Sequence, residues 1–142
     1  LANTDRFSAG PALRSIRGWV KTFFGCADCA KHFSAYYDEN GGAEISGHIE
    51  ASLWLWRAHN SVNLRLRATD PDAAPYKKLW PSNATCTECF TEAARVGNAS
   101  MSDVEDIEAQ WEPHRVFEFL QETFCFESDT FVCSGFDDVS RE

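Results

Sequence analysis

The segment GCADCAKHF, residues 25–33, places Cys26 and Cys29 three positions apart and His32 three positions further on. Such a cysteine pair can bind a metal, form a structural disulfide or transfer electrons by thiol–disulfide exchange. If a helix begins at the pair, its N-terminus lowers the thiol pKa values and favours exchange. The residue types and their spacing leave all three possibilities open.

The chain repeats this spacing at Cys86 and Cys89 and has a wider pair, Cys125 and Cys133. Six cysteines allow many connectivities, of which pairing within each motif is the simplest. Two glycosylation sequons, at residues 83–85 and 98–100, accompany the cysteines. Paired cysteines and sequons together favour the secretory pathway (endoplasmic reticulum or Golgi) or the extracellular space, and predict a glycoprotein.

Length and composition predict one folded domain, because 142 residues with 44% hydrophobic side chains can bury a core. A net charge of −9 argues against nucleic acid as a partner. No run of about 18 apolar residues is present, so we expect no membrane span. The chain starts without Met and without a signal-peptide pattern, as a piece of a longer protein would.

Hydrophobic periodicity predicts an all-α fold, a small helical bundle, that positions these cysteines. The expected helices cover residues 11–24, 27–37, 46–67, 86–95 and 113–124, with the first C-x-x-C at the start of the second. Residues 40–42 predict a turn, and residues 71–81 an irregular connection.

The longest expected helix carries two neighbouring stripes of side chains. One stripe is apolar and forms the expected core face: Ala51, Leu55, Ala58, Val62 and Leu66. The other holds Trp56, His59, Asn60 and Asn63 at i, i+3, i+4 and i+7, where Lys and Glu are usual. This second stripe is either a polar patch satisfied by a neighbouring helix or loop, or the wall of a site for a flat, hydrogen-bonding ligand.

Three segments resemble the Erv/ALR sulfhydryl oxidase domain, especially as found in quiescin sulfhydryl oxidases: FFGCADCAKHF, LWLWRAHNSVNLRL and KKLWPSNATCTEC. The resemblance covers roughly residues 13–94. It implies a helical bundle, with a four-helix core and a short extra helix, that binds FAD. The implied activity is oxidation of dithiols to disulfides with reduction of O2 to H2O2.

The resemblance also implies roles for individual residues. Cys26 would be attacked by the substrate thiol, and Cys29 would pass electrons to the flavin. Cys86 and Cys89 match a second family pair, which is structural or of unsettled use. The implied disulfides are Cys26–Cys29 and Cys86–Cys89, to which local pairing adds Cys125–Cys133, and no metal is expected. The implied FAD contacts are Asp28, His32, Trp56, His59, Asn60, Val62, Asn63, Lys77 and Trp80.

The family pattern implies further partners. Nothing before Arg14 matches the first family helix, so we expect another chain or segment to supply it. The expected electron donors are thiol-containing proteins or an upstream thioredoxin-like domain, and the acceptor is O2. We expect the Erv/ALR-like domain to span residues 1–124 and an acidic C-terminal extension to span residues 125–142.

Other interpretations compete with these. The four cysteines of the two C-x-x-C motifs match the ligand set of a zinc-binding interaction module, although the long helix separates them widely. A non-catalytic secreted scaffold held by inert disulfides, or an Erv-like fold that has lost its flavin, also explains the cysteines. Individually, His32 fits a core histidine, Lys77 a solvated lysine, Trp80 a core residue, and Cys125–Cys133 a staple of the tail.

Overall fold

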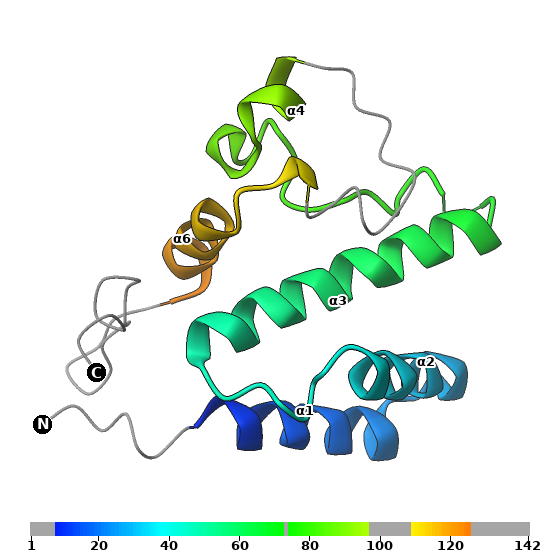
Figure 1. Cartoon of the computed structure of the whole chain (residues 1–142). Coiled ribbons are helices and arrows are strands. Elements are labelled where there is room, and N and C mark those ends of the chain that lie inside the picture. The colour runs from blue at the N-terminus through cyan, green and yellow to red at the C-terminus, as the bar shows by residue number, and fades with distance from the viewer. Residues whose placement is uncertain (1–7, 73, 97–108, 126–142) are drawn as a thin grey trace, which may run out of the picture. The chain divides into compact units, whose positions relative to one another are not determined.

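The computed structural model describes residues 8–72, 74–96 and 109–125, and within these it is helical (Figure 1). No strand occurs among them, and an isolated bridge between Phe90 and Trp111 is the one strand-like pairing they contain. The all-α prediction is therefore confirmed. The elements are α1 (Ala9–Phe23), α2 (Ala27–Glu39), α3 (His48–Thr69), η2 (Thr87–Cys89), α4 (Glu92–Val96) and α6 (Pro113–Phe124).

The chain divides into two compact units, Leu1–Ala58 and His59–Glu142. The division falls inside α3, so this helix gives its first half to one unit and its second half to the other. None of the described helices is both long and apolar enough to cross a bilayer.

Four expected helices begin and end within about two residues of α1, α2, α3 and α6, the usual uncertainty of a helix boundary. The expected helix over residues 86–95 is wrong. It is broken into η2 and α4 by Phe90, whose backbone is extended at φ −102° and ψ 144°. Backbone hydrogen bonds from Thr91 to Gln110 and from Glu112 to Cys89 replace the helical bonds at this point.

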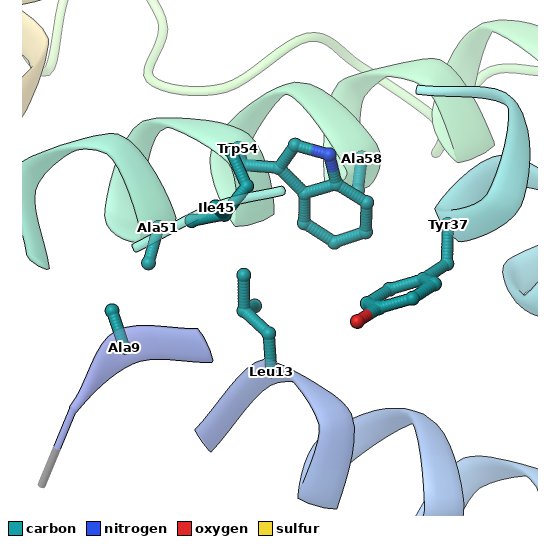
Figure 2. Packing of buried hydrophobic residues seen from close by; sticks show 7 residues of the cluster. All are labelled: Ala9, Leu13, Tyr37, Ile45, Ala51, Trp54 and Ala58. Carbon is teal, nitrogen blue, oxygen red and sulfur yellow. The ribbon is translucent and has the colours of Figure 1, made fainter. Parts of the chain in front are cut away.

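The first unit is built around Trp54, which is 4% exposed (Figure 2). Its ring makes edge contacts with Tyr36 and Tyr37 of α2, at centroid distances of 5.3 and 5.7 Å. Its indole Nε1–H donates to the Asn40 carbonyl over 2.8 Å, which satisfies the polar end of a buried ring. Small side chains of α1 and α3 pack in the same core: Ala9, Ala51 and Ala58. Leu13 and Ile45 complete the cluster.

The hairpin of α1 and α2 carries the first cysteine pair. Near its other end, Arg17 Nη2 donates to both carboxylate oxygens of Asp38 over 2.7 and 2.6 Å, and the guanidinium lies 4.8 Å from the Tyr37 ring centroid. Both charged side chains remain partly in water, so the pair stabilises the hairpin by no more than about 1 kcal/mol. The chain leaves α2 through Gly41, whose φ of +66° favours glycine.

Candidate active site

The first C-x-x-C lies where α2 begins. Cys26 is the N-cap residue, with extended backbone, and a disulfide joins it to Cys29 with a Cα–Cα distance of 5.2 Å. The Cys26 Sγ accepts a hydrogen bond from the Cys29 backbone N–H over 3.2 Å. The sulfur therefore takes the place of a capping oxygen, where a helix N-terminus stabilises negative charge.

The two sulfurs differ in access. Cys26 is exposed and Cys29 is only partly exposed, so an incoming thiol reaches Cys26 more readily. Asp28 lies in the first turn of α2, and both it and His32 are exposed. The alternative of a core histidine at position 32 is therefore wrong.

In the second unit, Asn60 holds the segment that precedes Pro81. Its side chain is completely buried, at 0% exposure. Its amide donates to the Trp80 carbonyl over 2.8 Å, and its amide oxygen accepts from the Trp80 backbone N–H over 2.9 Å. A loop therefore satisfies the Asn60 amide, as the polar-patch interpretation expects, and contact of Asn60 with FAD stays a prediction.

One turn later, Asn63 adds a second anchor to the same segment. Its Nδ2 donates to the Lys78 carbonyl over 2.8 Å and also lies 3.2 Å from Nε2 of His59. Since the bond to Lys78 identifies Nδ2 as a donor, Nε2 of His59 is the acceptor and its proton is on Nδ1.

The surroundings of His59 favour its neutral form. Partial burial of the ring lowers its pKa, and the positive charge of Lys77 lowers it further. The imidazole is nevertheless in contact with solvent, and it makes an edge contact with the Trp80 ring at a centroid distance of 6.3 Å. The result is an uncharged, hydrogen-bonding ring beside an indole and near an ammonium group.

The structure thus brings together part of the predicted cofactor set: His59, Asn60, Asn63 and Trp80, with Lys77 close enough to affect His59. Val62, Asn63, Lys77 and Trp80 are all half-buried. Asp28, His32 and Trp56 belong to the first unit, where Trp56 is buried at 3% exposure.

Sequence reasoning did not place two further residues in this cluster. Phe119 and Phe124 of α6 pack against the Trp80 ring, with centroid distances of 5.3 and 5.8 Å and tilted ring planes. The periodicity of α6 marked an apolar face but contained no signal for its partner, because Phe119 and Phe124 are far from Trp80 in the sequence.

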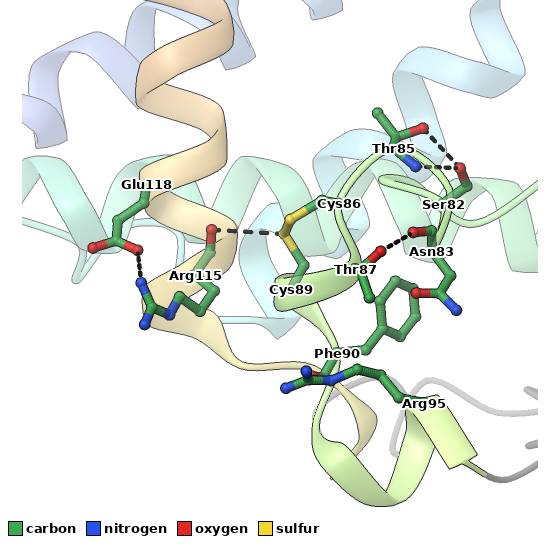
Figure 3. The surroundings of a disulfide bond; sticks show 10 residues. All are labelled: Ser82, Asn83, Thr85, Cys86, Thr87, Cys89, Phe90, Arg95, Arg115 and Glu118. Atoms are coloured by element: carbon green, nitrogen blue, oxygen red, sulfur yellow. Dashed lines mark hydrogen bonds and ion pairs between the residues drawn. A yellow bond between two sulfur atoms is a disulfide. The ribbon is translucent and has the colours of Figure 1, made fainter.

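The second C-x-x-C closes a small loop around η2, which we call the clasp (Figure 3). Cys86 and Cys89 are joined by a disulfide across η2, with a Cα–Cα distance of 5.4 Å, and Cys89 is 0% exposed. The Cys89 carbonyl accepts from the Glu112 backbone N–H over 2.8 Å. The Cys89 Sγ lies 3.6 Å from the Arg115 carbonyl oxygen, but a disulfide sulfur has no proton to donate.

A groove of about 610 Å³ lies beside this disulfide, and half-buried Cys86 is part of its wall. Three carboxylates and one guanidinium supply its charge, and the guanidinium of Arg115 is paired with Glu118 over 2.8 Å. The charged lining residues are Glu88, Arg115, Glu118 and Glu122.

The zinc-module alternative finds no support in the described residues. All four cysteines of its ligand set are consumed in two local disulfides. Across residues 8–72, 74–96 and 109–125, no group of three His, Cys, Asp or Glu side chains is arranged to hold a metal. Cys133 and the sequon at residues 98–100 lie outside the described residues, so those predictions stay open.

Comparison with known proteins assigns the fold to a family. The model of the Erv1 / Alr family matches residues 3–81, more than half of the chain. Sulfhydryl oxidase 1 of Gallus gallus is 35% identical over 113 residues, covering 79% of this chain and 14% of the relative. Sulfhydryl oxidase 2 of Homo sapiens is 31% identical over 113 residues, with the same coverage of 79% and 14%.

A third relative, sulfhydryl oxidase 1 of Homo sapiens, is 38% identical over 88 residues, which cover 59% of this chain and 11% of the relative. The chain thus spans only 11–14% of the length of these relatives. No solved structure matches it significantly. The family match and the geometry at Cys26 agree with the predicted resemblance: the chain belongs to the Erv1 / Alr family.

Proposed function

We propose that this chain is an FAD-dependent thiol oxidase domain that oxidises dithiols to disulfides and reduces O2 to H2O2. The observation that carries the proposal is the exposed, helix-capping disulfide Cys26–Cys29 in a member of the Erv1 / Alr family. An accessible sulfur at a helix N-terminus favours thiol–disulfide exchange, because the helix end stabilises the thiolate that exchange releases.

The cysteine chemistry proceeds in two exchanges. A substrate thiolate attacks the exposed Cys26 Sγ, the Cys26–Cys29 bond breaks, and its electron pair leaves with the Cys29 Sγ. A second substrate thiolate then attacks the substrate sulfur of this mixed disulfide and releases Cys26 as a thiolate. The Cys29 N–H and the α2 N-terminus stabilise that charge. The substrate is now a disulfide, and the protein holds two thiols.

FAD, when bound, would supply the two-electron chemistry that links oxidation of this dithiol to reduction of O2, with two protons, to H2O2. The donor set of the second unit fits such a cofactor. Neutral His59 can hydrogen-bond to a heterocycle, Trp80 offers an indole surface, and the Lys77 ammonium can pair with a pyrophosphate. Asp28, His32, Trp56, Val62 and Asn63 complete the proposed FAD contacts, and Asn60 supports the site through Trp80.

We assign Cys86–Cys89 a structural role. The buried sulfur of Cys89 is out of reach of a protein thiol, and the carboxylates of the adjacent groove oppose a thiolate at Cys86. The pair instead closes η2, whose Cys89 carbonyl accepts a hydrogen bond from the Glu112 backbone N–H at the start of α6.

The proposed electron donors are thiol-containing proteins or an upstream thioredoxin-like domain, in the secretory pathway or outside the cell. A further chain or segment is proposed to supply the first family helix. The exposed side chain of Asn83, in the first sequon, is consistent with that location.

The visible absorption spectrum of the purified chain, before and after addition of a dithiol, tests the function. We expect a yellow protein that bleaches with the dithiol and recovers its colour in air. A colourless protein that also fails to take up added FAD would overturn the proposal and favour the disulfide-bonded scaffold.

A further inference from the structure

We propose that α6 is a positioning element of the cofactor site, in which Phe119 and Phe124 hold the indole ring of Trp80 in its working orientation. The inference rests on the proposed function, because it takes Trp80 as a wall of the FAD site. It concerns residues beyond the segment 3–81 that the family model matches.

Two side chains of α3 hold the backbone at and near Trp80. Asn60 pairs with both the N–H and the carbonyl of Trp80, and Asn63 holds the carbonyl of Lys78. These bonds fix where the residue is. They leave the two side-chain torsions of Trp80, and so the plane of its ring, to other contacts.

The ring is restrained by α6. Phe119 meets it at 5.3 Å with an interplanar angle of 57°, and Phe124 meets it at 5.8 Å with an angle of 54°. Tilted aromatic pairs at these distances have a preferred geometry and so define an orientation. Phe124 is 62% exposed, so burial of its own surface does not account for its position at the last turn of α6.

The helix that carries these rings is itself firmly anchored. Val116 and Phe117 of the same helix are buried, at 0% and 7% exposure. Its start is tied to the clasp by the Glu112–Cys89 backbone bond and by the Phe90–Trp111 ring pair, whose centroids are 4.1 Å apart. The disulfide Cys86–Cys89 closes the η2 turn, which supplies the Cys89 carbonyl for that backbone bond.

The test uses variants of the 142-residue chain that are stripped of flavin and titrated with FAD. Phe119→Leu and Phe124→Leu each remove a ring at similar volume, and we expect each to weaken FAD binding by about 2- to 10-fold. Phe119→Tyr keeps the ring and should restore the affinity. Val116→Ala is the matched control on the same helix: it should lower the melting temperature but leave FAD affinity within about twofold.

A second readout follows Trp80 directly. In a ¹⁵N–¹H spectrum of the flavin-free chain, the indole N–H signal of Trp80, assigned with Trp80→Phe, should shift or broaden in both Leu variants and not in Val116→Ala.

If both Leu variants bind FAD like the parent chain and leave that signal in place, the inference is overturned while the proposed function stands. Equal loss of affinity in Val116→Ala would also overturn it, by showing a general effect of helix stability. A parent chain that binds no FAD would refute the proposed function, and the inference with it.

Discussion

The two C-x-x-C disulfides of this chain have the same spacing and nearly the same Cα–Cα distance, 5.2 and 5.4 Å, yet they lie in opposite surroundings. Cys26 caps a 13-residue helix and is open to solvent, and its sulfur accepts a hydrogen bond from the Cys29 backbone N–H. Cys89 ends a three-residue 3-10 helix and is completely buried. The motif therefore determines that a disulfide closes, and its neighbours determine whether that disulfide can react.

The neighbouring side chains differ as well. Exposed aromatic residues precede the first pair: Trp19 is 56% exposed, Phe23 71% and Phe24 46%. The second pair borders a groove in which Glu88, Glu118 and Glu122 outnumber one paired guanidinium. Negative charge raises the pKa of a nearby thiol and slows exchange, so the second site is poorly suited to electron transfer.

The largest effect is expected when a substitution removes the first disulfide, Cys26–Cys29. Cys29→Ser leaves Cys26 without a partner to release, so dithiol-dependent O2 consumption should fall by roughly 1000-fold or more. An oxygen electrode measures it. The matched control is Cys86→Ala combined with Cys89→Ala, which should keep activity within about threefold. Similar losses in both variants, with folding intact, would show that the two pairs are not functionally distinct.

The next largest effect is expected from removing the Asn60 side chain, which anchors the segment before Pro81 in the second unit. Asn60→Ala removes the two buried hydrogen bonds between the Asn60 amide and the Trp80 backbone, so the unfolding free energy should fall by about 2–4 kcal/mol. Urea denaturation of the flavin-free chain measures this. Asn63→Ala, at a half-buried position, should cost less. An equal cost at both positions would contradict the central role given to Asn60.

A smaller effect is expected from the clasp. Removing Cys86–Cys89 by a double alanine substitution should cost about 2 kcal/mol, because the closed loop is short, and lower the melting temperature by about 4–8 °C. The pair Cys26–Cys29 closes a loop of the same length. In flavin-free protein, an excess loss at the clasp therefore measures the contribution of burying Cys89. If the first pair proves the more stabilising of the two, the assigned structural role is wrong.

The smallest effect concerns pH. His59 has a pKa below its ordinary value of 6.5, so the unfolded chain binds the extra proton more readily. Stability should rise as pH increases from the folded pKa to about 6.5 and then level off, and should decline as pH falls through that window. Lys77→Gln should raise the His59 pKa in an NMR titration, since it removes one cause of the depression. Lys78→Gln, the neighbouring exposed lysine, should not; equal shifts in both would point to net charge instead.

Much of the fold and part of the site were predictable from the sequence. The helices follow from local apolar periodicity, and their boundaries at Pro113 and Cys26 follow from residues that suit a first turn or a cap. The redox motif was equally visible, because Cys26 and Cys29 are close in sequence and their helix start needs no distant partner. The order of the motifs at Cys26, His59 and Trp80 was enough to indicate the family.

Contacts between distant segments could not be predicted in this way. The sequence did not show that Trp54 is the centre of a core, that the Asn60 amide is consumed by the Trp80 backbone, or that Phe90 breaks a helix to pair with Trp111. Helical hydrogen bonds join residues four positions apart, so composition and spacing determine them locally. Which side chain satisfies a buried amide, or orients an indole ring, depends on segments that only the folded chain brings together, and the tertiary structure alone decided those partners.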